Sequence, residues 1–285
     1  MKKAIVFGLT VAAVCSCCKC AAIAKAANSV EVYVTISDKN GKIAVAQEKI
    51  CVTDINNDGR LTLDDALYLT HESAYNGGAD KGYKSSKTEY GTSLEMLWGA
   101  ENGSGFGYYL NSKSALSLDD EVKNGDFVDA FIYTDTKSFS DTYTFFENRI
   151  MESEIDEKFD LKLFSAGFDE NWQPITNSVP NAVIMIDGVE TEYHTNENGI
   201  AEIAVKNSGK HIISAKSDEK IIVAPICTVD SVQADVTEAL TTQSAAETFE
   251  KSANTGDCRN RILIASVIGM ISSVAITTTK KKKNE

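Results

Sequence analysis

Short apolar segments separated by tight-turn residues are the feature that most restricts the fold of this chain. Between residues 158 and 229 such segments recur about every ten residues, and Asp187-Gly188, Asn198-Gly199 and Ser208-Gly209 stand between them. These dipeptides adopt the left-handed backbone conformations that two-residue β-hairpins require. No helical period intervenes. We therefore predict a small antiparallel β-sandwich over residues 153–230.

The preceding region, residues 27–152, has a mixed pattern. Residues 30–36 place Val or Ile at every second position, the period of a half-buried strand, and a Lys-Asn-Gly turn leads into a second strand candidate at 42–54. Apolar residues spaced by three and four predict a helix from Leu63 to Tyr75. We expect a helix-like or irregular piece at 94–98 and strands at 105–110 and 127–133. The predicted class is thus α+β to mainly β.

Both ends of the chain carry export signals. Two lysines, an apolar run and the pair Ala24 and Ala26 form a secretory signal peptide over residues 1–26. The apolar run is shorter than the roughly 20 residues that a membrane helix needs. A lipobox-like alternative, residues 14–17, would leave a lipidated cysteine instead.

At the other end, Thr255-Gly256 precedes an apolar run, residues 262–276, and a Lys-rich tail, and with Thr277 to Thr279 the run gives a transmembrane segment over 262–279. This arrangement resembles the sortase cell-wall sorting signal of Gram-positive bacteria, although Ser252 and Ala253 replace the usual Leu and Pro. The resemblance implies cleavage between Thr255 and Gly256 within a signal over 254–285, and covalent attachment to peptidoglycan. The alternative is an uncut transmembrane anchor. Residues 231–253, rich in Thr, Ser, Ala and Glu, predict a flexible wall-spanning linker.

The net charge and the small numbers of cysteines and histidines argue against several classes of function. From Ala27 to Gly256 there are 18 Lys and Arg against 39 Asp and Glu, a net charge of −21, which disfavours nucleic acid and anionic lipid. Cys51 and Cys227 are the only cysteines in that range, and they either pair or remain two isolated thiols. Three histidines, all distant from cysteine in the sequence, offer little material for a His-based metal site or catalytic triad.

An acidic loop, residues 54–65, has the spacing of a twelve-residue calcium loop. Calcium takes oxygen ligands from positions 1, 3, 5, 7, 9 and 12 of such a loop, which turns sharply at a glycine in position 6. Gly59 occupies position 6. The predicted ligands in order are Asp54, Asn56, Asp58, Arg60 through its carbonyl, Thr62 and Asp65. The Asp at position 12 and the preceding strand make the loop similar to the calcium half-repeat of dockerin modules. Since only one repeat is present, the cohesin partner is not implied.

Residues 30–133, especially "SLEMLWGAENGSGFGYYLN" and "VKNGDFVDAFIY", resemble the transcobalamin-C-terminal-like β-grasp domains of bacterial surface proteins. The segment "NAVIMIDGVETEYHTNENGIAEIAV" resembles the prealbumin-like sandwich repeats of Gram-positive surface stalks. The first resemblance implies a β-grasp head and the second a spacer.

These observations predict a non-enzymatic, anchored extracellular protein that displays a calcium-stabilised head for binding or adhesion. Candidate ligand-binding residues are Trp98, Phe106, Tyr108 and Tyr109, which are also suited to core packing. The partner would be an extracellular protein, glycan or small molecule. An alternative function is capture of a small ligand such as a corrinoid-like nutrient. An enzyme with Asp and Glu as acid and base is the least supported, because no carboxylate lies in an apolar context.

Overall fold

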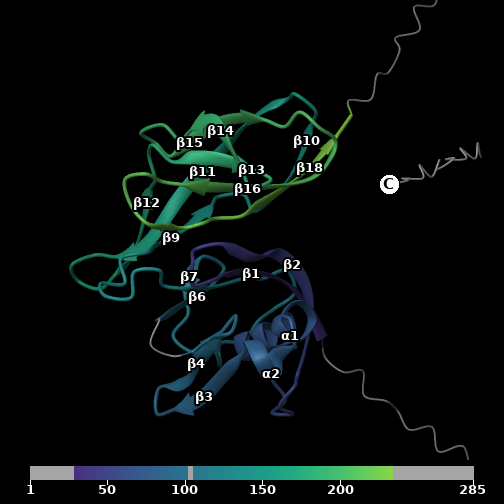
Figure 1. Cartoon of the computed structure of the whole chain (residues 1–285), viewed down its shortest axis with the longest axis vertical. Helices are drawn as coiled ribbons and strands as arrows, with labels where there is room; N and C mark the ends of the chain where they lie inside the picture. Colours follow the sequence, from purple (N-terminus) through teal and green to yellow (C-terminus); the bar gives the residue numbers. More distant parts are fainter. Residues whose placement is uncertain (1–28, 102–104, 234–285) are drawn as a thin grey trace, which may run out of the picture. The chain divides into compact units, whose positions relative to one another are not determined.

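The computed structural model describes residues 29–101 and 105–233, which form a mainly β structure with two helices (Figure 1). These residues all belong to one compact unit. The expected signal peptide and sorting signal lie outside the described residues, as does the predicted linker beyond residue 233. Among the helices that the structure describes, none is long and apolar enough to cross a membrane.

We call the part from β1 to β8 the head. Its elements are β1 (Ser29–Ser37), β2 (Ile43–Thr53), α1 (Leu63–Ala74), α2 (Ala79–Gly82), β3 (Lys84–Thr88), β4 (Gly91–Leu97), β5 (Ala100–Glu101), β6 (Phe106–Leu110), β7 (Lys113–Ser114) and β8 (Phe127–Ile132). The main sheet has the order β2-β1-β8-β6-β7. Strands β1 and β8 are parallel, and the other neighbours in this sheet are antiparallel.

The head core lies between this sheet and helix α1. Val32, Val34 and Ile36 of β1 are fully buried and pack in one cluster with Leu63 and Leu67 of α1. Because side chains alternate along a strand and recur every three or four residues along a helix, both patterns present one apolar face. The predicted helix and first two strands are confirmed.

A separate three-stranded sheet, β3-β4-β5, completes the head. The expectation of a helix-like or irregular piece at 94–98 is wrong, because β4 extends to Leu97 and pairs with β3 and β5. Thr92 and Leu94 are buried while Ser93 and Glu95 are half-buried, which is the period of a strand. The local preference of so short a segment for helix or strand is weak, and pairing with residues 84–88 makes it a strand.

The part from β9 to β18 is a β-sandwich, as the turn pattern predicts. Its strands are β9 (Thr142–Phe146), β10 (Ile150–Glu154), β11 (Lys158–Phe168), β12 (Pro174–Ser178), β13 (Val183–Ile186), β14 (Val189–His194), β15 (Ile200–Ala204), β16 (Gly209–Lys216), β17 (Ile222–Val223) and β18 (Cys227–Val232). One sheet has the order β10-β18-β16-β13-β14, and the other β12-β11-β9-β17 with β15 also paired to β11. The expectation of a wholly antiparallel sandwich is wrong, because β10 pairs with β18 and β17 with β9 in parallel. Turn signals predict only the hairpin pairs, whereas these two pairs join strands that are distant in the sequence. Both sheets contribute to one core, in which Leu161, Leu163, Ile184 and Ile213 are buried.

The boundaries of this sandwich differ from those expected. Strands β9 and β10, placed in the head by the sequence, pair with β11 and β18, so the sandwich begins at Thr142 rather than 153. Strand β18 likewise continues through Val232 into the expected linker. Strands β10 and β18 pair with each other although they are more than 70 residues apart, which the local sequence could not predict.

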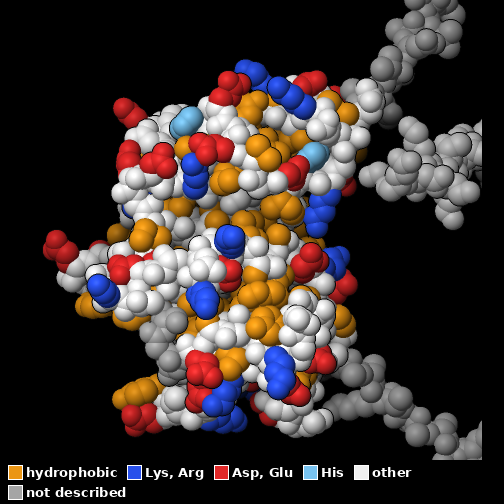
Figure 2. All heavy atoms as spheres, viewed as in Figure 1, with side chains coloured by type: hydrophobic (Ala, Val, Ile, Leu, Met, Phe, Trp, Pro, Cys, Tyr) orange, Lys and Arg blue, Asp and Glu red, His pale blue; other side chains and the backbone are white. Residues whose placement is uncertain are grey.

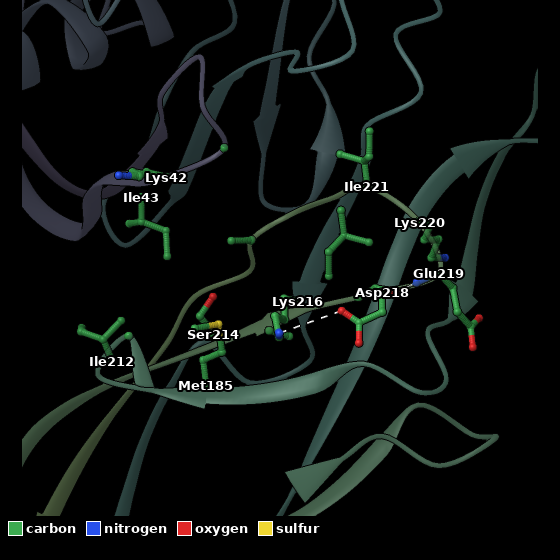
Figure 3. Close-up of a pocket in the computed structure, with 16 residues that line it drawn as sticks. Lys42, Ile43, Met185, Ile212, Ser214, Lys216, Asp218, Glu219, Lys220 and Ile221 are labelled. Carbon is green, nitrogen blue, oxygen red and sulfur yellow. Dashed lines mark hydrogen bonds and ion pairs between the residues drawn. The ribbon is translucent and has the colours of Figure 1, made fainter. Parts of the chain in front are cut away.

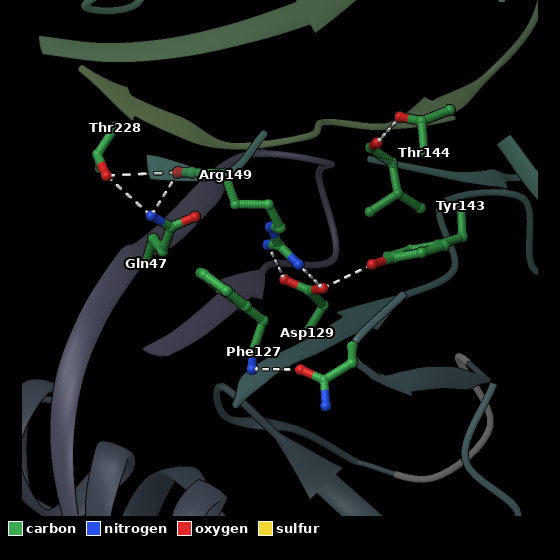
Figure 4. A network of polar contacts seen from close by, with 9 residues as sticks. Gln47, Phe127, Asp129, Tyr143, Thr144, Arg149 and Thr228 are labelled. Atoms are coloured by element: carbon green, nitrogen blue, oxygen red, sulfur yellow. Dashed lines mark hydrogen bonds and ion pairs between the residues drawn. The ribbon is translucent and has the colours of Figure 1, made fainter. Parts of the chain in front are cut away.

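Head and sandwich meet through buried polar contacts (Figure 4). The carboxylate of Asp129 accepts hydrogen bonds of 2.6 Å from both terminal nitrogens of Arg149 and from the hydroxyl of Tyr143. At an irregularity in the β1–β2 register, Gln47 takes up a φ of 51° and its amide donates to the Arg149 carbonyl and the Thr228 hydroxyl, each at 2.9 Å. These contacts fasten β8 and β2 of the head to the sandwich.

Candidate functional site

The acidic loop connects β2 to α1, and its backbone turns where the sequence predicts. Gly59 has a φ of 87° and Asn57 a φ of 62°, both in the left-handed region. A side chain at Gly59 would meet no atom within 4 Å, so the need for glycine there is conformational rather than steric.

Three polar side chains fold back over this loop. Asp54 accepts hydrogen bonds from the backbone nitrogens of Asp58 at 3.1 Å and Gly59 at 2.7 Å. Asn56 accepts from Asp58 at 2.9 Å, and Asp58 accepts from Arg60 at 2.9 Å. Each of these oxygens keeps a second lone pair. The loop thus holds its side-chain oxygens in place through its own amides.

Asp65 joins the loop to the start of α1. Its Oδ1 accepts from the backbone of Ile55 at 3.1 Å, and its Oδ2 accepts from the backbone and the hydroxyl of Thr62, each at 2.9 Å. Thr62 in turn caps the helix, accepting from the Asp65 backbone. Asp65 is fully buried, and this burial raises its pKa despite the hydrogen bonds to Ile55 and Thr62, which lower it. A buried carboxylate with raised pKa gains from any cation that shares it.

Arg60 points its side chain away from the loop. The guanidinium donates to Glu121 at 3.0 Å and to the carbonyl of Asp119 at 2.7 Å. These contacts fix the loop to the segment before β8, where Thr62 also forms an isolated bridge with Glu121. The predicted cation ligand at this position is the backbone carbonyl oxygen of Arg60, so the direction of the side chain does not affect it.

The chemistry of this donor set fits a hard cation such as calcium. Carboxylate, amide, hydroxyl and carbonyl oxygens are the ligands that calcium takes. Among the residues that the structure describes, no group of three or more His, Cys, Asp and Glu could hold a metal ion. A cation at this loop therefore needs the neutral oxygens of Asn56, Arg60 and Thr62 beside its carboxylates.

The four predicted ligand-binding aromatics do not share one surface. Half-buried Trp98 packs at the end of α1, where its ring lies 5.1 Å from Tyr75 and its backbone donates to Nε2 of His71 at 3.1 Å. Phe106 and Tyr108 pack against the head core. Tyr109 lies on the opposite face of β6 and stacks on Tyr143 of the sandwich with ring centroids 3.7 Å apart. Each ring thus has a packing role.

A cleft that the sequence did not reveal lies between the β1–β2 turn and the sandwich (Figure 3). It measures about 750 Å³. Its apolar lining comes from Ile43, Met185, Ile212, Ile221 and Ile222. The buried hydroxyl of Ser214, also in the lining, has no hydrogen-bond partner among the described residues. Lys216 pairs with Glu190 at 2.6 Å and lies 3.9 Å from Asp218, so its charge is balanced. The cleft therefore suits a largely apolar molecule.

The remaining sequence predictions concern the cysteines, the surface charge and the cleavage site. Cys51 is exposed and Cys227 buried, and both are free thiols rather than a disulfide. Burial raises the pKa of Cys227 to about 12. On the face shown in Figure 2, acidic and basic side chains are interspersed with apolar ones. Thr255 and Gly256 lie outside the described residues.

Comparison with known proteins leaves the fold to be judged on its own topology. No protein-family model and no curated protein matches the chain. Among solved structures, the chain is similar to the N-terminal four Ig domains of Dscam1 isoform 9.44, with 8% sequence identity and a TM-score of 0.21. The alignment covers 72% of this chain and 44% of that chain, so the chain spans less than half the length of that structure. A TM-score this low carries no structural argument.

Proposed function

We propose that this chain is a non-enzymatic, extracellular surface protein in which bound calcium stabilises the head for a role in binding or adhesion. The observation that carries the proposal is the loop between β2 and α1, in which Asp54, Asn56 and Asp58 are held by backbone amides around the turn at Gly59. Since Asp65 closes the same loop onto the first turn of α1, an ion bound there would tie the edge strand to the helix.

Two further observations support the head and anchor parts of the proposal. The order β2-β1-β8-β6, with a parallel central pair and a helix after the first hairpin, agrees with the β-grasp resemblance. The signal peptide and the sorting signal that the sequence predicts support attachment at the cell surface, through peptidoglycan or a membrane anchor. The non-enzymatic part of the proposal rests on the sequence, in which three histidines, each far from any cysteine, offer little material for a catalytic triad.

Thermal unfolding of the full-length protein with calcium and with chelator tests the calcium site. A ligand that binds only the native state stabilises it by about 2.7 kcal/mol at 100 times its dissociation constant, so the melting temperature should rise with calcium. Asp58→Asn keeps the oxygen that accepts from Arg60 but removes the charge, and should weaken the response. Asp38→Asn is the matched control, because Asp38 accepts backbone hydrogen bonds in a turn outside the loop. A calcium response equal in all three proteins would refute the site.

A second candidate function, capture of a small ligand, is favoured by the cleft and its apolar lining. A largely apolar molecule would fill this space. Titration of the protein with cobalamin in a calorimeter tests the corrinoid form of this function. The absence of heat and of any spectral change in cobalamin would discard it.

A further inference from the structure

The hairpin that joins β11 to β12 places aromatic side chains in water. Trp172 is 80% exposed and Phe168 is 47% exposed, and their ring centroids lie 6.2 Å apart with the planes inclined by 46°. Ile175, at the start of β12, is also exposed. Exposure of one large apolar residue is common, but an exposed pair of aromatic rings with a third exposed apolar residue within eight positions marks a candidate interaction site.

The hairpin backbone holds this cluster in one conformation. Asp169 accepts through Oδ1 from the backbone nitrogens of Asn171 and Gln173, each at 2.8 Å, and its carbonyl accepts from Trp172 at 3.0 Å. Trp172 has a φ of 60°, a left-handed conformation that is costly for a bulky side chain. Glycine or asparagine would serve the turn better. The hairpin therefore holds the indole of Trp172 exposed to solvent although this backbone conformation costs local stability.

The polar groups around the rings indicate the chemistry of the partner. Residues 167–178 include Asp169 and Glu170 but no Lys, Arg or His. Their carboxylates repel anionic lipid and anionic polymers. Glu170, Asn171 and Gln173 are exposed side chains that can accept or donate hydrogen bonds. Such groups pair with hydroxyls, while the negative face of an aromatic ring attracts polarised C–H groups.

We propose that the tip formed by Phe168, Trp172 and the polar residues between them binds a neutral glycan. One face of a sugar ring presents C–H groups and would stack on Trp172, while its hydroxyls would meet the carboxylates and amides of the turn. A flat protein partner fits less well, since a narrow hairpin tip offers little of the roughly 800 Å² per partner that a stable protein interface buries. The inference names the partner class of the proposed binding function, but it does not depend on the calcium loop.

Intrinsic fluorescence gives a direct test, because the chain has only two tryptophans. In Trp98→Phe, Trp172 is the sole reporter. We expect a saturable change in its emission with at least one member of a panel of neutral hexose, pentose and N-acetylhexosamine oligosaccharides. In the wild-type protein, retardation in gels containing the matching polysaccharide measures the same binding without the Trp98 substitution. Trp172→Ala should weaken retardation at least tenfold.

Tyr90→Ala is the matched control, because Tyr90 is an 84% exposed aromatic residue at a turn of the head. It should bind as the wild type does. No response to any oligosaccharide, or equal retardation of wild type and Trp172→Ala, overturns the proposal. So does Trp172-dependent binding to phosphatidylglycerol vesicles or to a protein in place of glycan. Calcium-dependent melting, measured on the same samples, reports separately on the loop and distinguishes failure of this inference from failure of the calcium site.

Discussion

Protonation of His71 is expected to destabilise the head, because the ring is fully buried in a neutral form. Its Nδ1 lies 2.6 Å from the carbonyl of Leu67, and its Nε2 accepts from the backbone of Trp98 at 3.1 Å. These partners assign the proton to Nδ1. A second proton on Nε2 would face the Trp98 N–H, so a donor would oppose a donor and that hydrogen bond would be lost.

The size of the effect follows from the pKa. Burial lowers the pKa of His71 from 6.5 to about 4, and the hydrogen bond to Leu67 only partly opposes this shift. The unfolded chain therefore binds the proton more readily than the folded one. Stability from this group is complete above about pH 6.5 and is lost as the pH falls toward 4. The difference corresponds to about 3 kcal/mol in total, of which about 2 kcal/mol is lost by pH 5.

Urea unfolding of wild type and His71→Gln at several pH values between 7.5 and 4 measures this loss. The pKa of Asp65 and that of His211 are both raised in the fold, but their contributions are common to both proteins and cancel in the difference. At pH 7.5 the wild type should be the more stable. That advantage should shrink by about 2 kcal/mol at pH 5. His194→Gln, which changes an exposed histidine, is the control and should follow the wild type.

Two results would refute the reasoning about His71. One is a stability difference between wild type and His71→Gln that stays constant from pH 7.5 to 4.5. The other is an NMR titration of the folded protein in which the His71 ring protonates near its ordinary pKa. Either would mean that the ring is hydrated or can move away from Trp98 at little cost.

Three further expectations concern other buried contacts. Arg149→Met should lower the free energy of unfolding by about 3–5 kcal/mol, because it leaves the Asp129 carboxylate buried without its cation. In urea unfolding, the double variant with Asp129→Asn should recover much of this loss. No recovery would contradict the pairing. Thr62→Ala should cost about 1 kcal/mol through loss of the α1 cap, measured by thermal unfolding in chelator, whereas an unchanged melting temperature would count against the cap. In alkylation followed by mass spectrometry, Cys51 should react in the native protein and Cys227 only after unfolding; early labelling of Cys227 would show that its site opens.

Local features could be predicted from the sequence because the interactions behind them span few residues. The turn at Gly59 and the backbone hydrogen bonds that Asp54 and Asp65 accept lie within twelve consecutive positions, so the spacing predicts where this loop turns. The helix that begins at Leu63 and the strand β1 follow from their apolar periods in the same way. Whether the loop binds calcium stays a prediction.

Contacts between distant residues were decided only by the tertiary structure. The parallel pairing of Tyr33 with Phe127 and the ion pair of Asp129 with Arg149 depend on which faces meet, and nothing local distinguishes those residues from other aromatic or charged side chains. The two tryptophans show the same limit. Trp98 packs against His71 of helix α1, whereas Trp172 at the β11–β12 hairpin is 80% exposed. Local sequence determines where the chain turns, whereas burial depends on which distant segments come to cover a side chain, and that is set by the packed fold as a whole.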